Sequence, residues 1–511
     1  MPPRVLCSRT LVPNGLRRLA LLRLRLRMTW QQITKFDVAA RFLSTLDNAV
    51  TGIAITPKES RKVLWKIDLT ILPLIWLSVI IAAVDKVVIS NAAIYGMKAD
   101  THLAGNQFAW VGSIFHVGYL LFEYPASFLI QRLPVAKFFS ATVLVWAIMM
   151  CCTAATHNFA GIAAVRFVMG MAEACLFPVC NIITVMWWKN SEQPVRIACW
   201  MSQFSSILTG VASYGIGNAH TSLASWRLLF LVLGGFSLLW ALIVFLFLPD
   251  SPAQCRYMAD REKFVCLQRV KGNNTGIEDK EIKWYQVREC LCDSKTWLLF
   301  LFGVAQNIPN GGVVTFAAII VSGFGYSTLV TTLLGIPTGI IATAWSWIIA
   351  YPAGRFRNSR CVIAASCNLL AVACAMLMWK LPRSNKKGLL ASYYVFYTYW
   401  GPYVIGSSLS MAKTSGHSKK VTMNAIFFLA YCTGSIIGPQ VFRADDAPAY
   451  THGHIGMVAC LLVASASLLA YCTVCAFENR KRNDLPSGLN GVCEAFSGRT
   501  DKEKSDFRYT Y

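Results

Sequence analysis

The sequence predicts an all-α membrane protein with about twelve transmembrane helices arranged as two six-helix bundles. Of its 511 residues, 55% are hydrophobic, and the mean hydropathy is +0.48. Only 14% are Asp, Glu, Lys or Arg, against roughly 25% in an average soluble domain. A soluble protein of this length needs more charge to cover its surface, whereas walls that face lipid need none. The deficit of charge therefore places most of the chain in a bilayer.

Apolar stretches long enough to cross a bilayer occur in two sets of six. The first set is expected at about 67–94, 107–130, 138–156, 159–185, 196–218 and 226–248. The second is expected at about 296–320, 327–353, 361–380, 388–412, 421–442 and 454–477. The predicted organisation is a basic tail (1–65), a first bundle (66–249), a mixed-charge central loop (250–295), a second bundle (296–478) and a polar tail (479–511). In such a plan the substrate binds near the midplane and the halves rock around it.

The basic residues indicate the orientation of the chain in the membrane rather than a nucleic-acid-binding function. The net charge is +23, but the bases lie mostly in the tails and in alternate short loops, a pattern typical of cytosolic segments. One loop, with Lys380, Arg383, Lys386 and Lys387, breaks the pattern. The balance predicts both termini in the cytosol, with the sequon Asn273–Thr275 in a cytosolic loop where it stays unmodified.

The first residues are arginine-rich and contain no acid before Asp37. Arginine interrupts every apolar run there, so no signal peptide is expected. A mitochondrial transit peptide and a true start at Met28 are both open readings, and a cytosolic tail is the default.

Cofactor chemistry is not expected. The chain has 18 cysteines, many within apolar runs, where they act as small hydrophobes. Cys290 and Cys292 are spaced C-x-C and lack the paired CxxC pattern of a zinc site. No phosphate-binding loop of the G-x-x-x-x-G-K-[ST] type occurs, so ATP is not the driver. We infer neither a metal site nor a disulfide framework, and no enzymatic activity.

Ionisable residues at membrane depth are costly and need a reason. The first half contains a small set of them: Asp85 and Lys86 in the first span, Glu123 in the second, and Arg166 and Glu173 in the fourth. The second half has almost none apart from Lys413, near a span end. With a rise of about 1.5 Å per residue, Asp85 and Arg166 fall at similar depth and could pair. The chemistry is therefore expected in the first bundle.

Each of these charges has a functional and a structural reading. Asp85 and Glu173 could take up a proton on one side and release it on the other as their partners change, or they could form static pairs. The planar fork of Arg166 could bind a carboxylate or clamp two helices. Lys86 could serve the substrate or extend toward the surface. For Glu123, gating or structural pairing is as good a reading as proton binding.

Polar candidates for substrate contact lie in the second half. The seventh span contains Gln306-Asn307-Ile308-Pro309-Asn310-Gly311-Gly312, where Pro and paired Gly are expected to break the helix beside a cavity. A packing kink is the alternative. Asn307 and Asn310 are the side chains we expect to face substrate. The tenth span carries an aromatic stripe that includes Tyr397, which could face substrate or simply pack. Asn424, in the eleventh span, is a further candidate.

Several motifs, in order, resemble the anion:cation symporter family of the major facilitator superfamily, and most closely its fungal allantoate permease group. The resemblance covers about 64–480. In the first half it includes Asp85–Ala92, Gly118–Pro125 and Arg166–Ala174, the last with the R-x-x-x-G signature. In the second half it includes Asn310–Gly312, Ser322–Tyr326, Gly416–Lys420, Gly438–Gln440 and Arg443–Pro448.

The resemblance implies a major facilitator fold and a division of roles. Asp85 and Glu173 match positions that bind the coupled proton in related organic-anion symporters, and Lys86 and Arg166 match cationic positions that serve the substrate anion. This sequence also departs from the family pattern. Lys86 replaces an arginine, Val88 an asparagine, Pro134 a glycine, and Gly354 an aspartate that helps to latch the bundles.

The sequence thus predicts a proton-coupled importer of a small organic anion, such as a ureido acid like allantoate, a vitamin-like carboxylate or a small peptide. Two alternatives stay open: an exporter of a small metabolite, and a nutrient sensor that does not transport. The partners expected are the substrate anion, the proton and the lipid bilayer. The protein is expected to be a monomer in the plasma membrane, with the vacuolar membrane as the other location.

Overall fold

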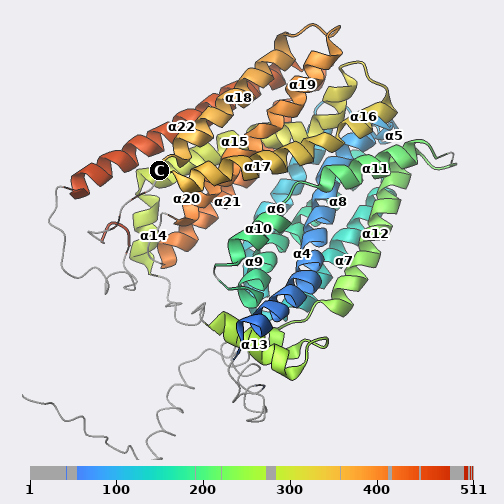
Figure 1. The fold of residues 1–511 in the computed structure, drawn as a ribbon. Helices are drawn as coiled ribbons and strands as arrows, with labels where there is room; N and C mark the ends of the chain where they lie inside the picture. Colours follow the sequence, from blue (N-terminus) through green and yellow to red (C-terminus); the bar gives the residue numbers. More distant parts are fainter. Residues whose placement is uncertain are drawn as a thin grey trace, which may run out of the picture.

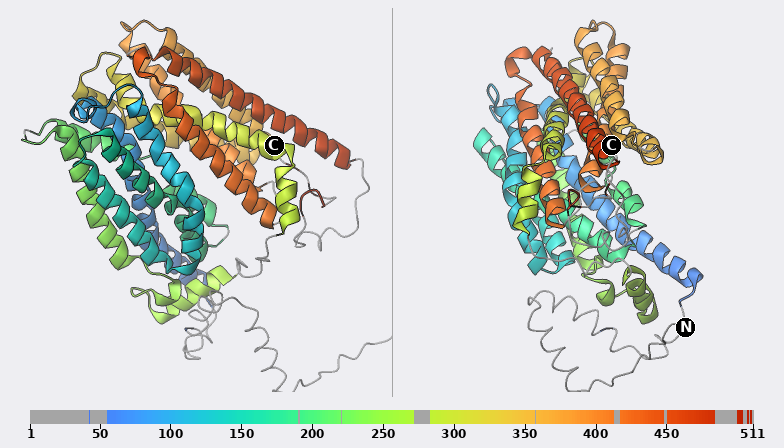
Figure 2. Two further views of the ribbon diagram at one scale, coloured as in Figure 1. Left: turned by 180° about the vertical axis from the view of Figure 1, so that it is seen from behind. Right: turned by 90° about the vertical axis from the view of Figure 1, so that its left-hand side faces the viewer.

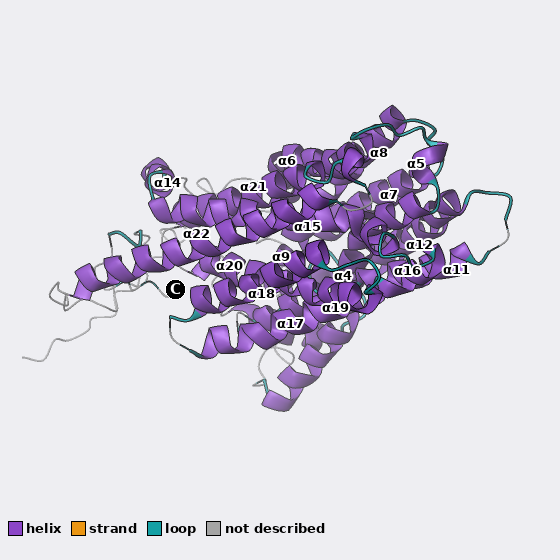
Figure 3. Ribbon diagram, turned by 90° about the horizontal axis from the view of Figure 1, so that it is seen from above, coloured by secondary structure: helices purple, strands orange, loops and turns teal. Residues whose placement is uncertain are grey.

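The structure is a computed structural model that describes residues 55–189, 191–219, 221–271, 283–356, 358–412, 417–447, 450–483 and 500–503, with Phe42, Phe507 and Tyr509. Across these residues the regular elements are all helices, which form two bundles side by side (Figures 1 and 3). The predicted all-α fold is confirmed. Met28, Lys413 and the sequon lie outside the described residues.

The first bundle begins with a long helix whose start the sequence explains. Thr56 caps α4 by accepting a hydrogen bond from the Glu59 N–H, and Pro57 occupies the first helical position. The helix therefore begins at Pro57, inside the predicted tail (1–65) and nine residues before the predicted start of the first bundle at 66. The elements of the bundle are α4 (Pro57–Ile94), α5 (Met97–Asp100), α6 (Gln107–Arg132), α7 (Val135–Thr153), α8 (Phe159–Ala174), α9 (Leu176–Trp187), α10 (Gln193–Trp200), α11 (Ser205–Gly217) and α12 (Ser225–Phe247).

The second bundle packs beside the first. Its elements are α15 (Ser294–Ser322), α16 (Thr328–Leu334), α17 (Ile336–Arg355), α18 (Arg360–Lys380), α19 (Lys386–Phe396), the 3₁₀ turn η2 (Tyr397–Tyr399), α20 (Trp400–Ala412), α21 (His417–Gln440) and α22 (Thr451–Asn483).

Ten of the described segments are long and apolar enough to span a membrane. The other two predicted spans are not among these ten. Their residues form divided helices instead, α10 and α11 in one and α19, η2 and α20 in the other, and the count of twelve stays a prediction. Prolines explain several breaks, because a proline lacks the N–H that would bond four residues back. Pro178 follows the break at Cys175, Pro337 the break at Gly335, and Pro402 the turn at η2.

The predicted break in the seventh span is wrong. α15 runs without interruption from Ser294 to Ser322 with Pro309 inside it. The paired glycines serve close packing: a Cβ on Gly311 would lie 2.7 Å from the Ser435 carbonyl oxygen, and one on Gly312 would lie 2.4 Å from the Phe442 ring. The glycines thus serve helix packing, since side chains at these positions would hold α15 and α21 apart. That this span also faces substrate stays a prediction.

The central loop is partly helical, with η1 (Pro252–Gln254), α13 (Asp260–Lys271) and α14 (Trp284–Leu291). α13 is tied to the first bundle by ion pairs from Glu262 to Lys66, Arg261 to Glu59 and Arg269 to Glu192. α14 is tied to the second bundle, where Lys419 Nζ lies 2.9 Å from Glu289 Oε1.

The bundles contact one another toward the end opposite α13 and α14. The Ala318 N–H donates to Ser90 Oγ at 2.8 Å, and Ser113 Oγ donates to the Ile436 carbonyl at 2.7 Å. A Cβ on Gly339 of α17 would lie 1.9 Å from the carbonyl oxygen of Gln203. Toward the other end the two bundles diverge (Figures 1 and 2). By the predicted orientation, the joined end is extracellular and the divergent end is cytosolic.

Candidate functional site

Four of the five charges predicted at membrane depth in the first bundle, Asp85, Lys86, Arg166 and Glu173, come together between α4 and α8. Arg166 and Glu173 lie on α8, which packs tightly on α6 because glycines stand at the crossing. A Cβ on Gly170 would lie 1.9 Å from the Phe115 carbonyl oxygen, and one on Gly118 would lie 2.1 Å from that of Phe167. The glycine four residues after Arg166 thus allows the backbones to touch, which gives the R-x-x-x-G motif a physical reason.

Asp85 is fully buried and has two donors. Arg166 Nη1 lies 3.4 Å from Asp85 Oδ2 and 3.3 Å from the Asp85 carbonyl oxygen. Trp146 Nε1, from α7, donates to the same carboxylate oxygen at 3.3 Å. The pairing expected from depth is therefore confirmed. Trp146, which the sequence did not single out, completes it.

Lys86 takes a different partner, which sequence reasoning missed. Its Nζ lies 2.5 Å from Glu173 Oε1, and both this ammonium and the Arg166 guanidinium lie over the Phe115 ring, at 5.4 and 4.8 Å from its centroid. The Lys86 side chain is 16% exposed, against 2% for Glu173. Lys86 is therefore the member of the pair that a solute can reach.

Together the four residues form a charge-neutral cluster, with two cations and two carboxylates. Three of its buried polar atoms have no hydrogen-bond partner within the described protein: Asp85 Oδ1, Arg166 Nε and Glu173 Oε2. Such atoms are costly to bury (about 1–3 kcal/mol each). A proton on a carboxylate oxygen or a ligand atom would reduce that cost. Glu173 also precedes the break at Cys175, so the helix is discontinuous directly beside it.

Aromatic side chains connect this cluster to the second bundle. The His116 ring, on α6, lies 6.0 Å from the Tyr431 ring of α21, and Tyr119 lies 5.2 Å from Phe428. Tyr431 in turn lies 6.1 Å from Tyr403 of α20. A movement of one bundle relative to the other would therefore change the aromatic contacts beside the cluster.

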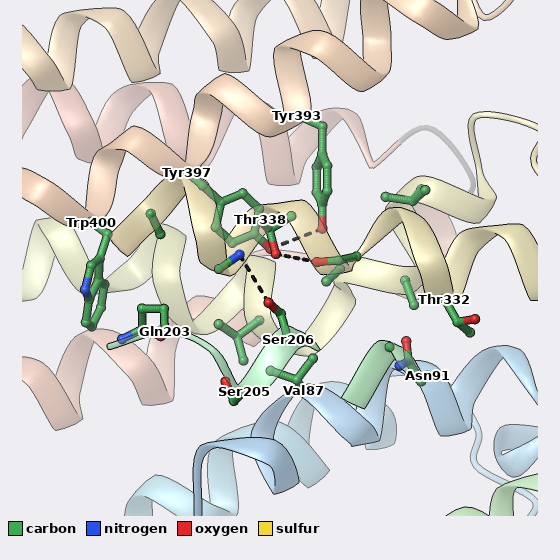
Figure 4. Close-up of a pocket in the computed structure, with 18 of the residues that line it drawn as sticks. Val87, Asn91, Gln203, Ser205, Ser206, Thr332, Thr338, Tyr393, Tyr397 and Trp400 are labelled. Carbon is green, nitrogen blue, oxygen red and sulfur yellow. Dashed lines mark hydrogen bonds between the residues drawn. The ribbon is translucent and has the colours of Figure 1, made fainter. Parts of the chain in front are cut away.

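A cavity lies between the bundles (Figure 4), and Val87, which follows Lys86 in α4, lines it. Its volume is about 740 Å³, counting space open to solvent, and none of the residues that line it is charged. Val87 and Asn91 of α4 form one wall, and Figure 4 shows Tyr393, Tyr397 and Thr338 on the opposite side. The Tyr393 and Tyr397 hydroxyls lie 3.1 Å apart.

The predicted substrate contacts divide between this cavity and the helix packing. Asn310 and Tyr397 line the cavity, and Asn310 Oδ1 accepts a hydrogen bond from Tyr399 at 2.8 Å. Asn307 is buried and donates to the Gly303 carbonyl in its own helix at 2.7 Å. Asn424 is not among the lining residues.

Glu123 lies outside the four-charge cluster. Its Oε2 is buried without a hydrogen-bond partner, and it forms no ion pair with any described residue. Structural pairing, one of its predicted readings, is therefore absent from the described part of the chain.

Other lining residues were not identified from sequence. Gln203 and Ser206 flank the start of α11, and Thr338 lies at the start of α17. The interruption of the helix at 201–204 was not predicted from the sequence. That interruption would have pointed to these residues, since irregular backbone at membrane depth occurs where it lines a cavity or is buried in protein. No metal-binding group of three or more His, Cys, Asp or Glu occurs among the described residues.

Residues 75–439 match the sequence pattern of the Major Facilitator Superfamily. The chain belongs to this superfamily. Among its relatives are the MFS-type transporter cnsL of Penicillium expansum, 34% identical over 93% of each chain, and the allantoate permease of Saccharomyces cerevisiae, 34% identical over 90% of this chain and 88% of the permease. The thiamine pathway transporter THI73 of the same yeast is 33% identical over 93% and 94%. These similarities confirm the predicted likeness to the allantoate permease group.

Solved structures agree on the fold. The D-xylose–proton symporter superposes with a TM-score of 0.60 at 12% identity, covering 78% of this chain and 97% of that one. A bacterial homologue of the human lysosomal transporter Spinster, in an inward-facing conformation, has a TM-score of 0.59 at 14% identity, covering 82% and 98%. Membership of the superfamily, together with these relatives, makes the chain a multi-pass membrane transporter and not an enzyme.

Proposed function

We propose that this transporter imports a small organic anion together with a proton. The observation that supports this most directly is the neutral buried cluster of Asp85, Lys86, Arg166 and Glu173. A monovalent anion that entered such a cluster alone would leave an uncompensated charge. A proton on Glu173 removes one negative charge and frees Lys86 Nζ for the anion, so proton and anion bind together.

Magnitudes favour this coupling. Pulling Lys86 away from an ionised Glu173 leaves a buried carboxylate unpaired, which costs about 3–5 kcal/mol. A single salt bridge between Lys86 and an incoming carboxylate offsets that cost only narrowly. Protonation of Glu173 avoids it. In the proposed cycle Asp85 remains the fixed counter-ion of Arg166, and the pair formed by Lys86 and Glu173 opens and closes.

The cavity is the proposed place for the rest of the substrate. Its lining is uncharged and combines apolar side chains with hydrogen-bonding ones, among them Asn310, Tyr397 and Ser206. A molecule that places one carboxylate at Lys86 and a neutral, hydrogen-bonding body in the cavity fits this arrangement of a charged cluster and an uncharged cavity. Ureido acids such as allantoate and vitamin-like carboxylates have this character, whereas small peptides, the third predicted class, also carry an ammonium. One relative is an allantoate permease. The plasma membrane is the proposed location.

Uptake by cells that express the chain tests the proposal. Labelled carboxylates are supplied at outside pH 5 and pH 7, with and without a protonophore. We expect uptake that rises at acid pH, collapses with the protonophore and is lost in Lys86→Met. The matched control is Lys137→Met, which removes an exposed lysine outside the site. Absent uptake with protein at the cell surface would reject import of these carboxylates, and efflux of a preloaded substrate would then support the exporter.

A further inference from the structure

The helix α14 runs between the cytosolic ends of two membrane spans. At its start, the Lys283 N–H donates to Ser418 Oγ at 2.9 Å, and the Ser418 N–H donates to Gln286 Oε1 at 3.2 Å. Ser418 is the first residue of the span in α21. At its other end, α14 is followed by Asp293, which caps the span in α15 by accepting from the Lys295 N–H. Both ends are therefore held at the first residues of two helices that are long and apolar enough to span a membrane.

The eight residues of α14 present two different faces. Gln286 and Cys290 are buried, and α14 packs on α21. The opposite face carries Trp284, Tyr285 and Leu291, which are 76%, 50% and 45% exposed. Arg288, one turn after Trp284, is exposed as well. In a helix of roughly 12 Å, this is an uncovered aromatic face with one cation.

This face is continuous with a wall that contacts lipid. Trp297 and Leu301 lie one turn apart on α15 and are 49% and 46% exposed. On a membrane-spanning helix such apolar residues face the acyl chains. Trp297 Nε1 donates to the Leu291 carbonyl at 2.7 Å, so the end of α14 touches that wall. Figure 3 places α14 at the edge of the second bundle beside α21.

We propose that α14 lies in the phospholipid headgroup layer of the cytosolic leaflet, with Trp284 and Tyr285 at the interface and Arg288 against anionic headgroups. Trp and Tyr favour this layer because one end of each ring system is apolar and the other is polar. The guanidinium matches the geometry of phosphate. The other helix of the central loop has no such face: the Asp260 side chain that begins α13 is 62% exposed, and α13 is tied to the first bundle by ion pairs.

Lipid cross-linking in the intact protein tests the location. The full chain is reconstituted in nanodiscs of phosphatidylcholine with phosphatidylserine, with photoreactive benzoylphenylalanine in place of Trp284, Trp297 or Asp260 in turn. Mass spectrometry then counts phospholipid adducts. We expect adducts at 284 comparable to those at 297, and none at 260. Adducts at 297 alone would overturn the proposal, and so would adducts at 260 equal to those at 284.

A charge variant tests the headgroup contact independently. Arg288→Gln is expected to reduce the gain in thermal stability that phosphatidylserine discs give over phosphatidylcholine discs. The control is Arg256→Gln, which removes an exposed arginine near α13 and is expected to keep that gain. If Arg288→Gln keeps the full gain, or if both variants lose it equally, the contact of Arg288 with anionic headgroups is refuted.

Discussion

The ion pair between Arg166 and Asp85 gives a prediction whose size can be worked out. Charges 3.4 Å apart attract by about 5 kcal/mol at an effective dielectric constant near 20. Arg166→Met removes this attraction and leaves Asp85, which is fully buried, with Trp146 as its remaining side-chain donor among the described residues. Breaking a buried pair from one side costs about 3–5 kcal/mol. We expect the free energy of unfolding to fall by that amount.

A double-mutant cycle separates the pair from other losses at Arg166, such as its contact with the Phe115 ring. Asp85→Asn alone leaves Arg166 uncompensated, so it should also destabilise. The double variant leaves neither charge, and we expect it to be at least about 1 kcal/mol more stable than the sum of the single losses predicts. The assay is denaturant unfolding in detergent micelles. Losses that add to within about 0.5 kcal/mol, or a single loss below that size, would refute the pairing.

Two further predictions concern the bundle contact and the C-terminal tail. In Gly339→Ala the new Cβ would lie 1.9 Å from the Gln203 carbonyl oxygen, so the variant should separate the bundles at their joined end and increase the labelling of cavity residues by a reagent added outside. The control Gly354→Ala, whose Cβ would have nothing within 4 Å, should not increase it. Equal labelling of the two variants would contradict the contact. Burial alone would raise the pKa of Asp501, but the Lys419 ammonium 2.7 Å away, the Tyr509 hydroxyl and the Lys295 ammonium together lower that pKa. Because the folded-state pKa is the lower one, the stabilisation is present at neutral pH and is lost as the pH falls through that pKa. The stability difference between wild type and Asp501→Asn should therefore stay constant from pH 7 to 5 and shrink below about pH 4, and a difference that already shrinks at pH 6 would contradict the ion pair.

The spans and the charged set were predictable because both follow from the cost of placing polar groups in lipid. An uninterrupted apolar run has few alternatives to a spanning helix. A charge within it must find a partner at its own depth, which predicted the pair of Asp85 and Arg166. The role of each residue in coupling stays a prediction.

Side-chain direction was harder to predict. Asp85 and Lys86 are neighbours in sequence but point about 100° apart on the helix. They therefore reach different turns of α8, where Lys86 meets Glu173. The indole of Trp146 comes from a span that has no charged residue at this depth, so the sequence gives no signal for it. A tryptophan in an apolar run more often serves packing alone.

The glycines of α15 and the C-terminal tail show two other limits. Gly311 and Gly312 are compatible with a break or with close packing, and only the position of α21 decides between them. The tail was predicted as polar, yet Asp501 and Tyr509 are buried. The main-chain N–H and carbonyl of Tyr509 pair with the Asn479 amide at 2.9 and 2.7 Å. Periodicity does not reveal such a contact, because it joins a short irregular segment to a helix end.

Proton movement in proteoliposomes tests the central claim most directly. A pH-sensitive dye inside the vesicles reports protons that enter when substrate is added outside. The wild type should acidify the lumen on substrate addition. Glu173→Gln, which mimics the protonated carboxyl and frees Lys86, should still exchange labelled for unlabelled substrate but move no protons. Substrate-driven acidification that persists in Glu173→Gln at the wild-type rate would contradict the proposed role of the pair formed by Lys86 and Glu173.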